Sequence, residues 1–129
     1  MSFTSSLRDF SERTESNLEQ VLRGTTISLF GKIIRRTPVK TGRLRGNWQT
    51  DINRPKSGEL DRTGAAGAMS EVSAEVNRAR LGDSIFMVNN LPYAKKIEDG
   101  GSDQAPVGMV KVTALEFETE INRRAGLLR

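Results

Sequence analysis

The chain of 129 residues contains no cysteine and no histidine. The lack of cysteine excludes disulfides, and the lack of both residues removes the usual ligands of a structural zinc site. The lack of histidine also removes the commonest general base and the histidine of a Ser-His-Asp or Cys-His arrangement. No apolar run approaches the ~20 residues that a membrane-spanning helix needs, so no contact with a membrane is predicted.

Aromatic residues are scarce, at 5% of the chain, with a single Trp and a single Tyr. The first residues show no basic region followed by an apolar segment, so no secretory signal is predicted. Apolar residues make up 36% and charged residues 28% of the chain. A chain of this length predicts one domain, here over residues 1–129, and its polar composition favours completion of the buried core in an oligomer.

The net charge of +4 is unevenly distributed. No acidic residue lies between Glu19 and Asp51, whereas basic residues recur through this stretch. Such a block can contact phosphates or acidic protein surfaces, or it can be a solvated helix end whose cations suit the helix dipole. These interpretations stay open for the candidate subunit-interface or DNA-channel residues Lys32, Arg35, Arg36, Lys40, Arg43 and Arg45.

The spacing of apolar residues predicts the secondary structure. Helical intervals indicate one long helix from Thr4 to Arg36, which Thr37-Pro38 ends. Alternation predicts a strand over residues 48–53, and a nearly continuous apolar run predicts a central strand over residues 84–89, covered on both faces. Further helices are expected over residues 69–81, 92–99 and 107–124, and a flexible loop over residues 55–68.

Several side chains are expected to face inward. The long helix has an apolar face that includes Phe3, Leu7, Phe10, Leu18, Val21 and Leu22, and the last helix has a stripe of Val110, Ala114, Phe117 and Ile121. The helix over residues 69–81 presents Val72, Val76 and Ala79. Trp48 is expected to be a core anchor, and Tyr93 and Ile97 to pack inward at a spacing of four. Gly24 and Gly31 would let another backbone approach the long helix closely.

No group of residues predicts an active site, a metal site or a cofactor. Glu116, Glu118 and Glu120 are spaced so that a helix scatters them around its surface. Asp99 and Asp103 flank a Gly-Gly pair but lack the order of a calcium loop. Glu98 is expected to accept hydrogen bonds from backbone N–H groups of the glycine loop that follows it.

Two segments carry the most specific pattern in the chain. One contains Asn89-Asn90-Leu91-Pro92-Tyr93-Ala94, then Ile97-Glu98-Asp99-Gly100, then Gln104-Ala105-Pro106-Val107-Gly108-Met109. The other runs Thr37-Pro38-Val39-Lys40-Thr41-Gly42-Arg43-Leu44-Arg45-Gly46-Asn47-Trp48 and follows the long helix. In their order along the chain, the two segments resemble the neck or tail-completion proteins of tailed bacteriophages, which include minor tail components. The motif residues in the resemblance are Trp48, Asn89, Pro92, Tyr93, Glu98, Gly100 and Pro106.

The resemblance implies an α+β fold, with a small mixed or antiparallel sheet packed against long N- and C-terminal helices. It implies a structural virion protein of the head–tail junction, assembled in the host cytoplasm, that forms a homo-oligomeric ring, commonly a hexamer. The implied partners are connector or head-completion proteins and tail tube or tail terminator proteins, with non-specific contact to genomic DNA in the channel. Asn89 or Asn90 is expected to bond backbone groups at the end of its strand.

Two alternatives come from other classes. The first is a small basic DNA-binding protein that uses the block over residues 23–45, although no helix-turn-helix or stacking platform is visible. The second is a small hydrolase or nuclease with a carboxylate–metal site. Assembly into a large oligomer would favour the structural role, whereas a monomer that shifts short duplex DNA would favour the first alternative.

Overall fold

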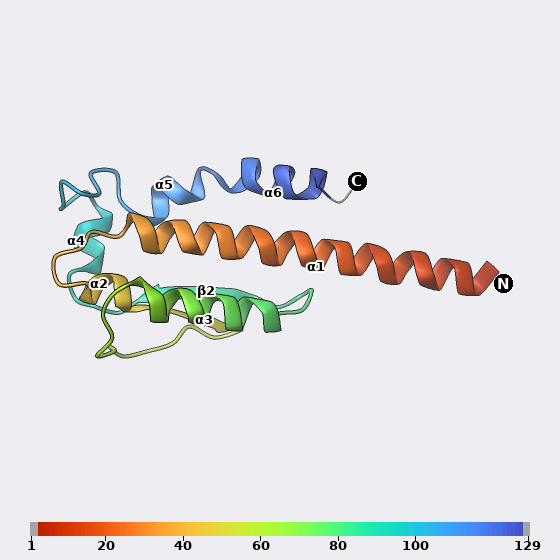
Figure 1. Ribbon diagram of the computed structural model, residues 1–129, viewed down its shortest axis with the longest axis horizontal. Helices are drawn as coiled ribbons and strands as arrows, with labels where there is room; N and C mark the ends of the chain where they lie inside the picture. Colours follow the sequence, from red (N-terminus) through yellow and green to blue (C-terminus); the bar gives the residue numbers. More distant parts are fainter. Residues whose placement is uncertain (1–2, 128–129) are drawn as a thin grey trace.

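The computed structural model describes the backbone of residues 3–127 and the side chains of residues 12–127. The elements in chain order are α1 (Phe3–Arg36), α2 (Arg43–Gly46), β1 (Trp48–Ile52), α3 (Ala65–Arg78), β2 (Ile85–Asn89), α4 (Ala94–Glu98), α5 (Val110–Ala114) and α6 (Phe117–Gly126) (Figure 1). The predicted α+β fold is confirmed, with one two-stranded antiparallel sheet among the described residues.

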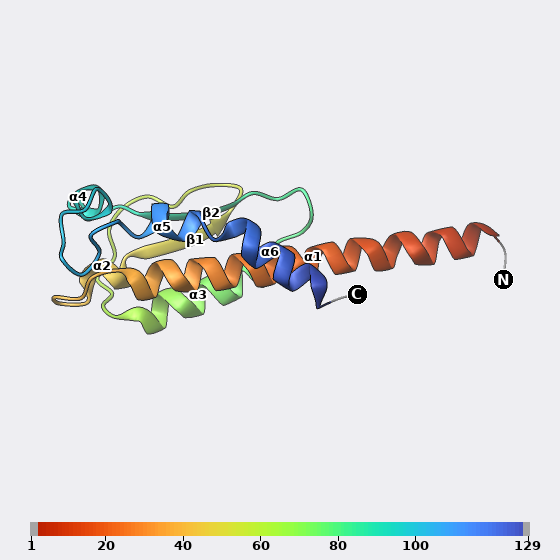
Figure 2. The ribbon, with the colours of Figure 1, turned by 90° about the horizontal axis from the view of Figure 1, so that it is seen from above.

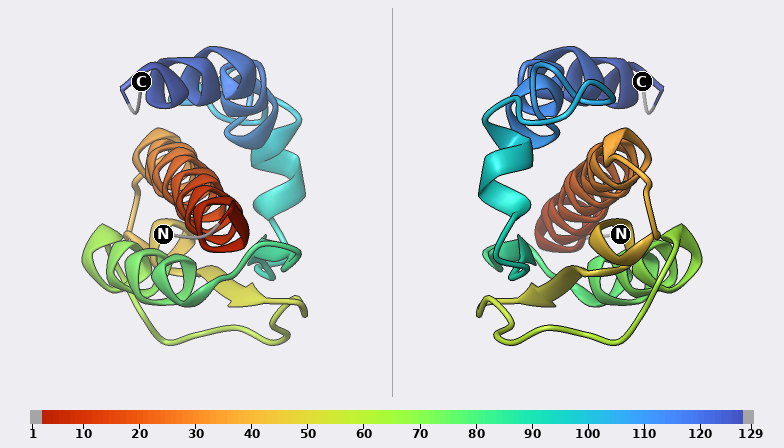
Figure 3. Two further views of the ribbon diagram at one scale, coloured as in Figure 1. Left: turned by 90° about the vertical axis from the view of Figure 1, so that its right-hand side faces the viewer. Right: turned by 90° about the vertical axis from the view of Figure 1, so that its left-hand side faces the viewer.

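The long helix α1 organises the fold. It lies between α5 and α6 on one side and α3 with the sheet on the other (Figure 1). An end-on view shows α4 at a third side of α1 (Figure 3). The N-terminal half of α1 projects beyond every other element (Figure 2). The domain is therefore built around the C-terminal half of this helix.

The sheet pairs β1 with β2 in a register that runs from Trp48 opposite Asn89 to Ile52 opposite Ile85. Side chains close the outer edge of β1, because Arg62 donates to the Trp48 carbonyl at 2.7 Å and Glu71 accepts from the Thr50 N–H at 2.7 Å. The prediction that β2 is a central strand covered on both faces was wrong. With one neighbour in the described chain, β2 is only partly buried and presents Phe86 to solvent.

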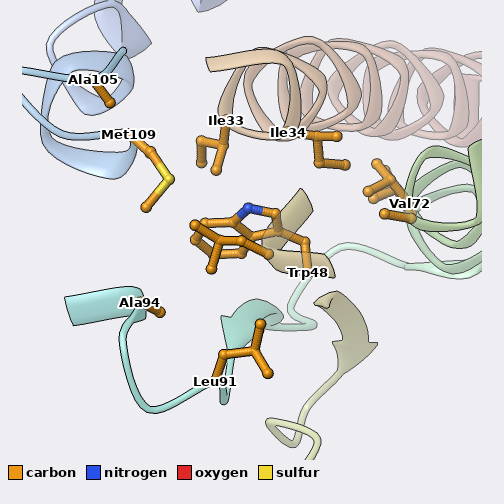
Figure 4. Packing of buried hydrophobic residues seen from close by; sticks show 11 residues of the cluster. Ile33, Ile34, Trp48, Val72, Leu91, Ala94, Ala105 and Met109 are labelled. Carbon is orange, nitrogen blue, oxygen red and sulfur yellow. The ribbon is translucent and has the colours of Figure 1, made fainter. Parts of the chain in front are cut away.

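Trp48 lies at the centre of the core, as its sequence context predicts (Figure 4). Ile33 and Ile34 of α1, Val72 of α3 and Met109 surround the indole (Figure 4). Burying an aliphatic side chain of this size contributes about 1.5–3 kcal/mol. The helix α3 begins at Ala65, four residues earlier than expected, and its predicted inward residues Val72, Val76 and Ala79 are buried.

The apolar face predicted for α1 is only partly buried. Val21 is buried, whereas Leu18 is 51% exposed and Leu22 is also exposed. The predicted inward positions of Phe3, Leu7 and Phe10 lie outside the described side chains. Gly24 and Gly31 allow close approach of side chains rather than of a backbone, since a Cβ at these positions would meet Arg124 and Arg35 at 3.0 and 3.1 Å.

The prediction of one continuous C-terminal helix with an inward apolar stripe was wrong. The chain after Pro106 turns before α5 begins at Val110, and α5 and α6 are separate helices. Val110 and Phe117 are exposed, whereas Thr113 and Glu120 are buried. The inward residues are polar because α1 supplies partners, as Arg36 donates to Thr113 at 2.8 Å and Ser28 bonds Glu120.

The segment between β1 and α3 is held by polar contacts. Asn47 accepts from the Leu60 N–H at 2.7 Å and donates to the Leu60 carbonyl at 3.1 Å, while Gln49 donates to the Gly58 carbonyl at 2.8 Å. Because α3 already begins at Ala65, the connection is shorter than the expected loop over residues 55–68. The expected flexibility of this loop stays a prediction.

Candidate assembly interface

The basic block is divided between internal contacts and outward charges. Lys32 and Arg36 of α1 both bind Glu116, at 2.8 and 2.5 Å. These hydrogen bonds hold the pKa of Glu116 below its usual value. Two of the six candidate residues therefore join α1 to the segment between α5 and α6.

Arg45 has a structural role at the end of α1. Its guanidinium donates to the carbonyls of Arg35 and Thr37 at 2.9 and 2.7 Å. The last carbonyls of a helix lack partners within the helix, so Arg45 satisfies groups that would otherwise need water. Arg43 lies nearer the surface and pairs with Glu59 at 3.3 Å.

Arg35 and Lys40 remain as outward cations. Both are exposed, and neither forms an ion pair with a residue of the described chain. The outward face of the basic block therefore consists of Arg35, Lys40 and the half-exposed Arg43. Whether these residues meet a protein or DNA stays a prediction.

The Asn-Asn pair anchors the end of β2, as expected. Asn89 donates to the Leu44 carbonyl at 2.8 Å and accepts from the Leu91 N–H at 3.2 Å. Asn90 donates to the carbonyls of Lys56 and Gly58, both at 3.1 Å. The pair therefore joins β2 to α2 and to the loop after β1.

The prediction that Tyr93 packs inward was wrong, whereas Ile97 is partly buried against the core, as expected. Its side chain is 40% exposed, and the buried residues around it are Leu91 and Ala94. Tyr93 directly precedes α4, so Ala94 rather than Tyr93 faces the core. Tyr93 instead lines a hollow of about 490 Å³ together with Val39 and Ile97, and Pro92 is exposed beside it.

Glu98 caps α5 rather than the glycine loop predicted for it. Its carboxylate accepts from the N–H groups of Met109, Val110 and Lys111 at 2.8, 2.8 and 2.9 Å. Desolvation opposes ionisation of Glu98, but these hydrogen bonds hold the pKa of the carboxylate below its usual value. The motif residue Glu98 therefore fixes where the chain enters α5.

The turn between α4 and α5 depends on glycine. Gly100 has a φ of 94°, and a Cβ there would lie 2.9 Å from the carbonyl oxygen of Pro106. The ring of Pro106 is exposed, so this motif residue contributes its carbonyl to the close approach. A side chain at position 100 would be both strained and crowded.

An exposed apolar groove follows α1, and the sequence patterns did not predict it. We call it the α1–α6 groove; two adjoining hollows form it and share Leu29, Phe30 and Phe117, and further walls come from Leu22, Leu81 and Ile85. Phe117 is 50% exposed in this groove. The sequence analysis placed Phe117 in an apolar stripe at helical spacing. Such a stripe indicates that one face of the helix is apolar, but it does not show whether another part of the chain covers that face.

The described residues contain no group of three or more carboxylates that could hold a metal ion. No helix within the described range is long and apolar enough to cross a membrane. Glu116 and Glu120, two of the three glutamates considered in the sequence, have different partners. Glu116 binds Lys32 and Arg36 of α1, and Glu120 binds Arg123 and Arg124.

Comparison with protein families identifies the chain. Residues 2–100 match the model of the HK97 gp10-like family, which is described as "Bacteriophage HK97-gp10, putative tail-component". The chain belongs to this family. The match covers α1 through α4. The Gln104–Met109 segment and the N–H groups that Glu98 binds at the start of α5 lie after residue 100, outside the matched range. Comparisons with curated proteins and with solved structures gave no match.

Family membership makes the chain a tail component of a bacteriophage virion. The resemblance of the two segments to phage tail-completion proteins is thereby confirmed at the level of the family. The family is a structural one, and its description names no reaction.

Proposed function

We propose that the chain acts at the phage head–tail junction as a structural, non-enzymatic protein. Copies form a ring, with six subunits as the expected number, which completes the tail and joins it to the head connector. Family membership supports a tail component. The observation that supports assembly with other subunits is the α1–α6 groove. Exposed apolar surface with a polar rim is typical of protein interaction sites.

Omission of the protein tests this role directly. Particles assembled without it should contain filled heads and finished tails that fail to join stably, and supply of the purified chain should restore joining. Electron microscopy of the lysate counts joined and separate structures. Normal infectious particles from a clean deletion would contradict the proposal.

The outward part of the basic block is proposed to meet acidic surfaces of neighbouring subunits or of the connector. Arg35, Lys40 and Arg43 are the residues concerned, and Arg suits paired hydrogen bonds to carboxylates. The double variant Lys40→Glu with Arg43→Glu should block assembly. Lys95→Glu is the control, because Lys95 is an exposed cation on α4. Normal rings with altered DNA retention would instead assign these residues to the channel.

A further inference from the structure

The N-terminal part of α1 extends beyond the other elements, and Glu19 at its inner end accepts from the Leu81 N–H at 3.4 Å. We call residues 3–20 the arm; at 1.5 Å per residue it is about 27 Å long. The arm projects past the domain, and the side chains of residues 12–18 are exposed (Figures 1 and 2). Isolated helices of this length are marginal in water, and most helices in proteins are stabilised by packing of an apolar face.

The arm offers such a face. Leu18 and Leu22 are four residues apart on one side of the helix, and both are exposed. Leu22 also lines the α1–α6 groove, so the apolar face of the arm continues into the groove wall. Because α1 runs as one helix through this region, the arm cannot fold back into the groove of its own chain.

Charge favours a second copy as the occupant of the groove. Residues 3–20 contain four acidic and two basic residues, whereas the rest of the chain contains 12 acidic and 18 basic residues. The lining of the groove includes Arg23 and Arg80 as well as Glu19 and Asp83. At the end of α6, Arg123 and Arg124 share the single carboxylate of Glu120. An acidic helix thus meets a basic body when two copies associate.

We infer that the arm of one copy docks along the α1–α6 groove of another copy, with Leu18 and Phe117 in contact across the interface. This is a helix-in-groove contact, in which exposed leucines fill an apolar cleft. The contact joins two different surfaces, so repetition generates a closed ring or an open filament according to its rotation. Closure into a ring rests on the proposed function, whereas the contact between arm and groove does not.

Charge insertion with matched controls tests the contact. Leu18→Glu places a charge on the arm and Phe117→Glu places one in the groove. Their controls are Gln20→Glu on the arm and Leu115→Glu, since Leu115 is 84% exposed and lies outside the groove. We expect at least a tenfold weaker self-association for the first pair and no comparable loss for the controls, measured by sedimentation velocity over a range of concentrations. Equal behaviour of all four variants overturns the inference.

Disulfide trapping gives a second measurement that does not depend on affinity. The chain has no cysteine, so introduced thiols report only the chosen positions. Each variant chain then carries a single thiol, so a disulfide between positions 18 and 117 can form only between two copies. Leu18→Cys mixed with Phe117→Cys should give a covalent dimer under copper–phenanthroline oxidation. The mixture with Leu115→Cys should not.

The outcomes separate this inference from the proposed function. If purified chains stay monomeric, the same cysteine pairs are oxidised in assembled particles, where absence of the Leu18–Phe117 product overturns the inference. Disulfides between two Leu18→Cys chains would show that arms pair with each other, which also overturns the inference. A product that joins Phe117→Cys only to a different virion protein overturns it as well. If the cysteine pairs give no Leu18–Phe117 product in particles whose heads and tails are joined, arm docking is wrong and the junction role stands.

Discussion

The indole N–H of Trp48 donates a hydrogen bond of 2.7 Å to the hydroxyl of Thr37, inside the core. The same hydroxyl donates to the Ile33 carbonyl at 2.7 Å, so Thr37 links the end of α1 to the start of β1. Both residues belong to the Thr-Pro-Val motif segment of the sequence. The motif therefore combines a helix stop at Pro38 with a buried polar contact that sets the position of the tryptophan.

Replacing Thr37 tests this link. Thr37→Val keeps the shape but leaves the buried indole N–H without its acceptor, which should lower the free energy of unfolding by about 1–3 kcal/mol. Thr37→Ser keeps the hydroxyl and should cost clearly less. Urea unfolding followed by Trp48 fluorescence measures both variants. The hydrogen bond is unimportant if Val and Ser cost the same.

Glu98→Gln should destabilise the entry into α5. The amide cannot reproduce three charge-assisted hydrogen bonds to the N–H groups at residues 109–111, so the expected loss is about 1.5–3 kcal/mol. Glu118→Gln on the exposed face of α6 is the control and should stay within about 0.5 kcal/mol of wild type. Thermal and urea unfolding give both values, and equal stability of the two variants would contradict the role of Glu98.

Stability should fall in acid through a defined carboxylate. The hydrogen bond from Arg123, aided by Ser28 and Arg124, lowers the pKa of Glu120 to about 2 despite desolvation. Because the folded pKa lies below the unfolded value of about 4.3, this contribution is fully present above that value and is lost as the pH falls toward 2. The pKa values of Glu98 and Glu116 are lowered in the same direction.

Glu120→Gln should therefore flatten the decline of the melting temperature between pH 4.5 and pH 2. Glu118→Gln, on the exposed face of α6, is the control for this slope. Melting temperatures at several pH values measure this slope. A Glu120→Gln protein that keeps the wild-type slope would show that another group controls acid unfolding.

Gly46→Ala should be among the most harmful single-methyl changes in the chain. A Cβ at this position would lie 2.2 Å from the Arg62 carbonyl oxygen, and the backbone around Arg62 would have to move. That movement would also strain the contacts of Arg62 with the Gly46 and Trp48 carbonyls. The expected loss is about 3 kcal/mol or more.

Gly126→Ala is the matched control for this change. Apart from its chain neighbours and its own helix backbone, no described atom lies within 4 Å of a Cβ built at Gly126. Alanine favours a helix over glycine by up to about 1 kcal/mol. Stability should therefore stay constant or rise slightly. Chemical denaturation compares the two variants, and a similar loss in both would show that the space at Gly46 does not decide the effect.

Local patterns predicted the parts of the fold that depend on local physics. The long helix, the two strands and the core position of Trp48 follow from periodicity and from the helix stop at Pro38, and each is present. The Asn89 and Asn90 contacts were also expected, because asparagine at a strand end commonly bonds nearby backbone.

The misassigned parts depend on partners that are distant in sequence. Thr113 and Glu120 are buried because they form hydrogen bonds with Arg36 and Ser28 of α1. The pattern of apolar residues around position 113 cannot reveal these distant partners. Burial of these polar groups rotates Phe117 outward and creates the apolar groove. Tyr93 was misplaced for a related reason, since the spacing of Tyr93 and Ile97 is equally compatible with a surface groove.

The unequal surroundings of α1 divide one helix into two regimes of local stability. Around Ile33 and Ile34 the helix can open only when the core unfolds, so these amide protons should exchange as slowly as global unfolding allows. Residues 12–18 are exposed and lie beyond the other elements, so the helix can open there without unfolding of the core, and exchange should be orders of magnitude faster. If another protein covers the N-terminal part of α1, the new contacts stabilise the helix there. Amide exchange along residues 12–18 should then be slower in the assembled chain than in the isolated chain, although the fold is the same.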